Sequence, residues 1–135
     1  MNYWLVKSEP FKYPFEQFLK DKTAVWDGVR NYQARNNLKA MQKGDFVLFY
    51  HSNEGKEIVG LAKVTKTFYQ DPTTDDDKWV VVDLAPMKKF KKTVTLEQLK
   101  GHSILYTMAL VKQSRLSVTP VKVEEFDLVL ALAGE

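Results

Sequence analysis

Residues 26–36, with the sequence WDGVRNYQARN, combine residue types that suit the binding of a planar polar ligand. The segment holds a tryptophan, a glycine, two arginines and several side-chain amides. A buried core has no need for this mixture, because buried polar groups without hydrogen-bond partners cost free energy. A site that stacks on a flat ring and forms hydrogen bonds with its edge does need it. The segment therefore predicts a nucleobase-binding site at which no reaction takes place.

The side chains of this segment have distinct expected tasks. Trp26 offers a ring face, and stacking of a base on an aromatic ring contributes about 1–3 kcal/mol. Asp27 can accept a hydrogen bond from an exocyclic amine, and Asn31 can form paired bonds with a base edge. Arg30 and Arg35 can hold phosphate groups. The structural alternative is a buried tryptophan, a glycine turn, a helix-capping asparagine and solvated arginines, and spacing alone favours it.

Two further polar segments follow apolar stretches. Residues 50–52 end an expected strand and can form the polar mouth of a barrel, or can simply be satisfied by backbone groups. Residues 113–115 offer an amide, a hydroxyl and a cation together, which suits a base edge plus a phosphate; an exposed connection is the open alternative. The candidate binding residues of these segments are Tyr50, His51, Gln113, Ser114 and Arg115.

The sequence KKFKK at positions 88–92 is a basic cluster around one aromatic residue. Such a cluster can follow a phosphate backbone and make binding sensitive to salt. A solvated strand edge protected by lysines is the better-supported alternative, because exposed edges are commonly defended in this way. The candidate phosphate ligands are Lys88, Lys89 and Lys91, together with Arg35.

Metal binding and catalysis have little support in the sequence. The acidic run at positions 75–77 lacks the spacing of a calcium loop and has no histidine nearby. Cysteine is absent, and His51 and His102 are the only histidines. No local motif of a hydrolase, a phosphate-binding loop or a metalloprotease is present. We expect no metal, no cofactor and no enzymatic activity.

The composition suits one domain over residues 1–135, because a chain of 135 residues can build a core without disulfides or metals. The net charge of +3 gives a mild preference for anionic partners. No apolar run approaches the roughly 20 residues of a membrane span, and residues 1–7 do not resemble a signal peptide. We expect a monomer with no membrane contact, located in the cytoplasm, or in the nucleus of a eukaryote.

Short strands and helices alternate irregularly along the chain, which predicts an α+β fold. The sheet should have about six strands and be strongly bent or closed into a small barrel, with short helices around it. Both faces of residues 46–52 are mostly apolar, which is typical of a central strand or of a strand in a barrel. Gly60 indicates a bulge or a close backbone approach. Strands are expected at 3–7, 46–52, 58–68, 79–84 and 116–119. Helices are expected at 14–21, from a cap at Asn31 to about residue 41, at 95–100 and at 126–133. Residues 104–110 are ambiguous between a helix and irregular structure.

Five motifs, taken in order, closely resemble those of the EVE domain family. The resemblance covers nearly the whole chain, and its second and last motifs are long. The motifs are YWLVKSEP at 3–10, WDGVRNYQARN at 26–36, Gly44-Asp45 with Phe49-Tyr50-His51-Ser52, Val59-Gly60, and Gln113-Ser114-Arg115-Leu116-Ser117-Val118.

The resemblance implies a PUA-like fold, a bent β-barrel with flanking helices that is related to YTH domains. It also implies binding of a flipped, modified base, chiefly a modified cytosine in DNA, in an aromatic and polar pocket. Trp26 stands where the related YTH domains place a cage tryptophan. The implied pocket residues are Lys7, Ser8, Glu9, Trp26, Asp27, Val29, Arg30, Asn31, Tyr50, His51, Gln113, Ser114 and Arg115.

Two alternatives to a DNA-base reader remain open at this point. The first is a PUA-like RNA-binding module. The second is a nuclease or base hydrolase in which His51 acts with Asp27 or Glu9, although the sequence shows no second catalytic group close to the histidine. The expected partner is nucleic acid, with DNA favoured over RNA.

Overall fold

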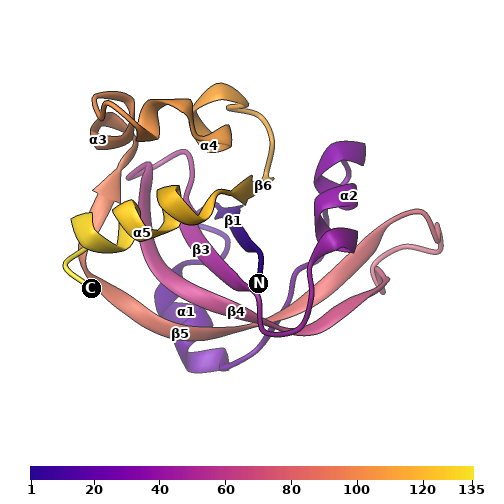
Figure 1. The fold of residues 1–135 in the computed structure, drawn as a ribbon. Coiled ribbons are helices and arrows are strands. Elements are labelled where there is room, and N and C mark those ends of the chain that lie inside the picture. The colour runs from indigo at the N-terminus through magenta and orange to yellow at the C-terminus, as the bar shows by residue number, and fades with distance from the viewer.

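The computed structural model describes residues 1–135 and builds them around one six-stranded sheet (Figure 1). The strands lie in the order β2-β5-β4-β3-β1-β6, with β1 and β3 parallel and the other pairs antiparallel. The mixture of helices with this mostly antiparallel sheet confirms the predicted α+β class. The edge strands β2 and β6 do not pair with each other, so the bent sheet does not close into a barrel. The strands are β1 (Tyr3–Ser8), β2 (Ala24–Val25), β3 (Phe46–His51), β4 (Glu57–Gln70), β5 (Val80–Thr95) and β6 (Val118–Val121).

Short helices cover both faces of this sheet. On one face lie α1 (Phe15–Asp21) and α2 (Tyr32–Ala40). On the other lie α3 (Leu96–Lys100), the 3₁₀ turn η1 (Leu105–Thr107), α4 (Ala109–Lys112) and α5 (Val123–Leu132). No helix has both the length and the apolar character needed to cross a bilayer.

Strand alternation explains why the protein has two apolar cores. In β3, Val47 and Phe49 face the core that contains α1 and α2, while Leu48 and Tyr50 face the core that contains α5. Successive side chains of a strand point to opposite faces, so a strand that is apolar at every position needs cover on both sides. The central position of β3, between β1 and β4, confirms the prediction for residues 46–52.

Two predicted helix starts are confirmed. The Asn31 side chain accepts a hydrogen bond from the Ala34 backbone N–H at 2.9 Å and so caps α2. Thr95 and Gln98 form the reciprocal capping box at the start of α3. Each bond satisfies a backbone group that the first turn of a helix would leave unpaired.

Gly60 shows both features that were predicted for it. The pairing register of β4 shifts at this residue against both neighbouring strands. The buried Phe15 ring lies directly on its Cα, and a Cβ added there would overlap carbons of the ring. The glycine therefore allows α1 to pack closely on the sheet.

Three strands, β5, β2 and β6, differ from the sequence prediction. β5 runs from Val80 to Thr95, well past the predicted end at residue 84, because its lysine-rich half pairs with β4 along one edge. The short strand β2 was not predicted, and it is defined only by two residues paired with β5. β6 begins at Val118 and includes Pro120, whereas the predicted strand began at residue 116 and ended at residue 119. An edge strand tolerates proline, since its outer side needs no N–H donor.

Candidate functional site

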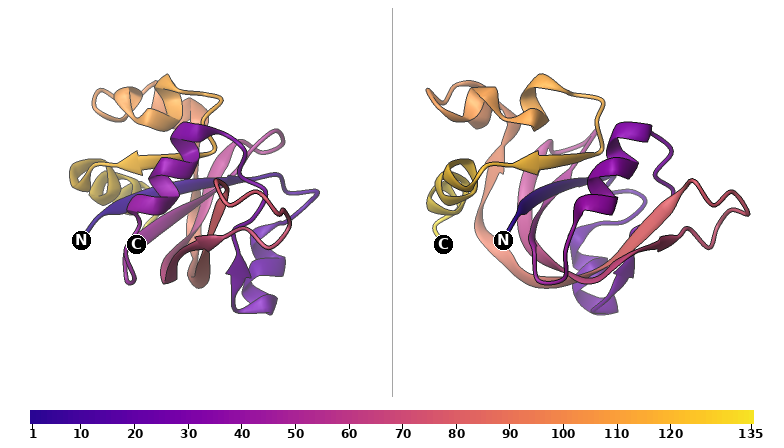
Figure 2. Two further views of the ribbon diagram at one scale, coloured as in Figure 1. Left: turned by 90° about the vertical axis from the view of Figure 1, so that its right-hand side faces the viewer. Right: turned by 45° about the vertical axis from the view of Figure 1, so that its right-hand side comes forward.

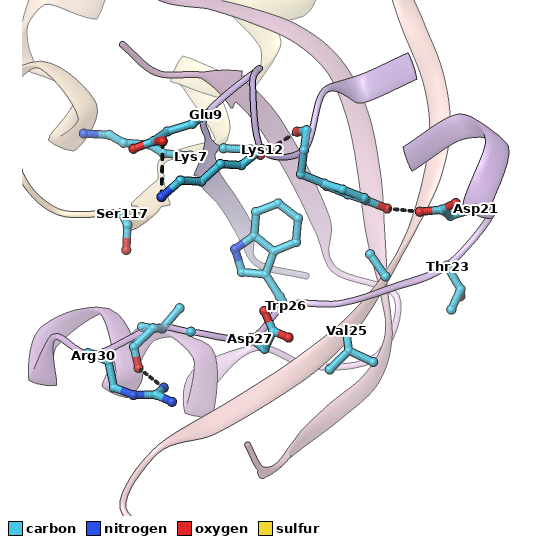
Figure 3. A pocket seen from close by; sticks show the side chains of 15 residues that line it. Lys7, Glu9, Lys12, Asp21, Thr23, Val25, Trp26, Asp27, Arg30 and Ser117 are labelled. Atoms are coloured by element: carbon cyan, nitrogen blue, oxygen red, sulfur yellow. Dashed lines mark hydrogen bonds and ion pairs between the residues drawn. The ribbon is translucent and has the colours of Figure 1, made fainter. Parts of the chain in front are cut away.

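A pocket of about 680 Å³ opens where the end of β1 meets the loop between β2 and α2 (Figure 3). This volume lies within the range of ligand-binding clefts in proteins. We call it the Trp26 pocket. Its lining comes from distant parts of the chain: Lys7, Ser8, Glu9, Lys12, Tyr13, Asp21, Thr23, Ala24, Val25, Trp26, Asp27, Gly28, Val29, Arg30 and Ser117.

The half-buried Trp26 indole stands in the middle of this pocket (Figure 3). Edge-to-face contacts hold it, with ring centroids 6.3 Å from Tyr13 and 5.6 Å from Phe49. Its backbone N–H donates to the Val82 carbonyl of β5 at 2.9 Å. The indole N–H has no hydrogen-bond partner in the protein and is not sealed from solvent. The indole is thus rigidly placed and still has a free donor.

A buried carboxylate fixes the loop that carries Trp26. Asp71, between β4 and β5, accepts hydrogen bonds from the Gly28 backbone N–H and from Arg30 Nη1, each at 2.9 Å. The Thr73 backbone N–H and hydroxyl also donate to it, at 2.8 and 2.6 Å. The Arg30 guanidinium in turn lies 5.7 Å from the centre of the Trp79 ring. These contacts tie the pocket loop to the projecting end of the β4–β5 ribbon (Figure 2).

The ionisation of Asp71 follows from the same contacts. Burial by itself would raise the pKa of this carboxyl group. The hydrogen bonds from Thr73, Arg30 and Gly28 outweigh burial and hold the pKa of Asp71 below its ordinary value. The group is therefore an anion at neutral pH, and it offsets the charge of Arg30.

The end of β1 forms the opposite wall. Lys7 Nζ donates to the Ser114 carbonyl at 2.6 Å, and the Lys7 backbone N–H donates to the Ser117 carbonyl at 3.0 Å. Burial lowers the pKa of Lys7. Glu9 Oε2 lies 3.5 Å from Lys12 Nζ in the turn that follows β1. The wall thus joins residues from both ends of the chain.

Tyr13 closes this side of the pocket. The buried Ser8 hydroxyl donates to the Tyr13 carbonyl at 2.6 Å, and the Tyr13 hydroxyl donates to Asp21 at 2.9 Å. Burial, together with that bond to Asp21, raises the pKa of the Tyr13 phenol. The phenol therefore remains a neutral donor, and its ring stays fixed against the edge of Trp26.

Two smaller hollows lie on the same side of the protein. The larger of the two, of about 410 Å³, shares the lining residues Lys7, Glu9 and Ser117 with the Trp26 pocket. The smaller, of about 280 Å³, shares Ser114 and Arg115 with the 410 Å³ hollow. Each hollow thus shares lining residues with the next, and we call the three together the depression.

A family model for the EVE domain matches residues 2–132. The chain belongs to the EVE domain family. Thymocyte nuclear protein 1 of Mus musculus is 40% identical to it over 165 residues, which cover 97% of this chain and 73% of the mouse protein.

Solved structures agree with this assignment. A crystal structure of a protein from Agrobacterium tumefaciens is 44% identical, with a TM-score of 0.97 over 99% of this EVE domain and 94% of that chain. Human THYN1, crystallised in complex with 5-methylcytosine-containing DNA, is 36% identical, with a TM-score of 0.91 over 100% of this chain and 99% of that chain. A YTH domain of Zygosaccharomyces rouxii, solved with N6-methyladenosine RNA, shares the fold at 14% identity and a TM-score of 0.60.

The structure of this EVE domain brings most of the predicted site residues to the three hollows of the depression. The Trp26 pocket collects Lys7, Ser8, Glu9, Trp26, Asp27, Val29 and Arg30. The adjoining hollows collect Asn31, Tyr50, Gln113, Ser114 and Arg115. Tyr50 is buried, which raises the pKa of its phenol.

His51 lies outside the lining of all three hollows. Its Nε2 accepts a hydrogen bond from the Phe15 backbone N–H at 3.1 Å. Pro14, which precedes α1, provides no side-chain cap, so His51 satisfies a donor at the start of this helix. Burial lowers the pKa of His51, and Glu57 opposes that effect in part. The structural alternative for this residue therefore describes it better than the site prediction does.

The predicted phosphate ligands lie outside the depression as well. Lys88 Nζ is 2.9 Å from Glu135, and Lys89 pairs with Glu16. Lys91 is exposed on β5. Arg35 donates to Asn36 and lies 5.0 Å from the Tyr32 ring centre. The outer edge of β5 beyond its contact with β2 has no partner strand, which matches the alternative of a lysine-protected edge.

Sequence reasoning missed several lining residues, among them Tyr13 and Ser117. Tyr13 gives no signal of its own, because it comes to Trp26 only through the turn after β1. Ser117 was within reach of prediction. It belongs to the quoted motif at 113–118 and lies two residues beyond Arg115.

Proposed function

We propose that the Trp26 pocket binds one base flipped out of a nucleic acid, without reacting with it, and that a modified cytosine in DNA is the favoured ligand. The observation that carries this proposal is the half-buried Trp26 indole, which stands in an open polar pocket with a free N–H. The human relative crystallised with 5-methylcytosine-containing DNA supports the choice of ligand.

The pocket offers suitable groups for the edge of a cytosine. The exposed Asp27 carboxylate lines it, and a carboxylate can accept a hydrogen bond from the exocyclic amine of cytosine. The Trp26 N–H and the Ser117 hydroxyl are available as donors to ring or carbonyl acceptors. Extrusion of a base costs a few kcal/mol, and stacking on an aromatic ring contributes about 1–3 kcal/mol towards that cost.

A hydrolase based on His51 has less support. Its Nε2 is engaged by the Phe15 N–H, and its side chain is not part of the pocket lining. Glu9, one of the two suggested partner groups, is paired with Lys12, while Asp27, the other, lines the pocket without His51. A general base must come within hydrogen-bond reach of the proton that it removes, and the contact of His51 directs its ring elsewhere.

Binding of matched oligonucleotides tests the proposal. The probes are single-stranded and duplex DNA with one cytosine or one 5-methylcytosine, and RNA of the same sequence. We expect preference for the methylated DNA. Trp26→Ala should weaken binding by about tenfold or more, since 1.4 kcal/mol corresponds to a factor of ten.

Phe68→Ala is the matched control, because Phe68 is an exposed aromatic residue of β4 that lines none of the three hollows described above. It should bind like the wild type. Equal affinity of the wild type for every probe would overturn the proposal. Tighter binding of the RNA than of the DNA would overturn DNA as the ligand and support the alternative of a PUA-like RNA-binding module.

A further inference from the structure

Cations without protein partners gather on one side of the Trp26 pocket. Arg115 is exposed and lines both smaller hollows, and its guanidinium forms no ion pair and no hydrogen bond within the protein. Lys56 is exposed on the rim of the larger hollow and also has no carboxylate partner. We call the two smaller hollows together the basic groove. By contrast, Arg30 is engaged by the buried Asp71.

Both cations are carried by well-fixed backbone. Lys56 ends the β3–β4 turn, where it adopts a left-handed conformation with φ of 44°, and its carbonyl accepts the Leu96 N–H at 2.9 Å. Arg115 lies in a turn closed by the Leu116 N–H to the Gln113 carbonyl at 3.0 Å. Left-handed residues other than glycine cost free energy and tend to occur at functional sites.

The larger hollow of the basic groove shares lining residues with the Trp26 pocket. Lys7 and Ser117 line both the pocket and the larger hollow. Lys7 Nζ donates a hydrogen bond to the Ser114 carbonyl, which links the pocket wall to the turn that carries Arg115. The carboxylate that lines both cavities, Glu9, is already paired with Lys12. A chain that leaves the pocket on this side therefore meets mainly positive charge and neutral polar groups, among them Asn53 and Gln113.

We propose that the basic groove binds the sugar–phosphate backbone of the DNA strand that carries the flipped base, with Arg115 and Lys56 each contacting a phosphate. This proposal rests on the proposed function of the Trp26 pocket. Phosphate contacts fix the register of a nucleic acid without reading its sequence. The groove therefore contributes affinity that is independent of the base in the pocket.

The salt dependence of binding tests this role. Arg115→Gln, Lys56→Gln and the double variant are titrated with single-stranded oligonucleotides that contain cytosine or 5-methylcytosine, at several salt concentrations. Each phosphate contact on a single strand contributes about 0.7 to the slope of log K against log salt. This slope is negative, and we expect its magnitude to decrease by about 0.7 in each single variant and by about 1.4 in the double variant. Methylated and unmethylated probes should lose affinity by the same factor.

Two controls separate the groove from the pocket. Lys63→Gln removes an exposed cation of β4 that has no ion pair and lines none of the three hollows described above, and it should leave the slope unchanged. The nucleoside 5-methyl-2′-deoxycytidine has no phosphate, so its binding in an NMR titration should fall in Trp26→Ala and stay unchanged in Lys56→Gln.

The outcomes distinguish the two proposals. Unchanged slopes in the groove variants, equal effects of Lys63→Gln, or loss of nucleoside binding in Lys56→Gln would each overturn the groove proposal. A smaller magnitude of the slope in the groove variants, without any preference for 5-methylcytosine, would support the groove proposal and overturn the proposed function of the pocket. Absence of binding to every oligonucleotide would overturn both.

Discussion

The carboxylate of Asp71 accepts a hydrogen bond from the backbone N–H of Gly28 at 2.9 Å, across 43 residues of sequence. Asp71 does not line the Trp26 pocket, yet it sets the path of the loop that does. Gly28 has a φ of 79°, a conformation that glycine adopts without strain. The shape of the pocket therefore depends on a residue in the turn between β4 and β5.

Asp71→Asn should destabilise the protein and weaken binding of the modified base. The amide presents N–H groups to a site where Gly28, Arg30 and Thr73 already donate, so some of these donors lose their acceptor. Loss of hydrogen bonds to a charged group costs about 1.5–3 kcal/mol. Urea unfolding measures the loss of stability, and the oligonucleotide titration measures the loss of binding.

Asp75→Asn provides the comparison for this change, because Asp75 is an exposed acidic residue of the same β4–β5 connection. It should keep both stability and binding. If Asp71→Asn unfolds at the wild-type urea concentration and binds normally, the carboxylate does not hold the pocket loop.

Stability should fall as the pH drops below about 6.5, and His51 should account for part of the fall. Burial holds the pKa of His51 in the folded protein below its ordinary value of 6.5, so the unfolded chain takes up the proton first. The contribution of neutral His51 is complete above pH 6.5 and is lost progressively below it. Unfolding free energies at pH 7.5, 6.5 and 5.5 measure this dependence.

His51→Gln removes this titration while it retains a polar side chain. Its stability should therefore change less between pH 7.5 and 5.5 than that of the wild type. An identical pH dependence of the two proteins would show that His51 is not the group responsible.

Gly60→Ala should destabilise the protein, because the added methyl group would overlap the buried Phe15 ring. Overpacking of a well-packed core typically costs about 1–3 kcal/mol. Gly101→Ala is the control, because Gly101 has a negative φ and a Cβ there would lie 3.4 Å from the Glu97 carbonyl. Chemical denaturation should show a clear loss for the first variant and little change for the second. Equal stability of the two variants would contradict the packing.

Local sequence signals predicted the elements that depend on local physics. The alternation in β3, the Asn31 cap and the capping box at Thr95 each follow from neighbouring residues. The lysine-rich half of β5 carries no such signal, since it is a strand only because β4 pairs with it. The same limit explains β2, which exists through two residues opposite Asp83 and Leu84.

The candidate site was predictable to the extent that its residues lie in conspicuous motifs. Trp26 and Asp27 share one segment of unusual composition, and the structure brings them to one pocket. Asp71 was not among the predicted site residues, because nothing in its sequence neighbours shows that it is buried and accepts hydrogen bonds from Gly28 and Arg30. Contacts across tens of residues, rather than residue types, decide these cases.

Lys7 and Ser117 belong to the same wall of the Trp26 pocket, where the Lys7 backbone N–H donates a hydrogen bond to the Ser117 carbonyl at 3.0 Å. A nascent chain cannot assemble that wall until residues 117–121 have left the ribosome and β6 has paired with β1. Pairing of such distant segments is slow to nucleate, because a long loop must first be closed. The base binding that we propose for this pocket therefore requires residues 117–121, and a translation product that ends before this segment would lack it.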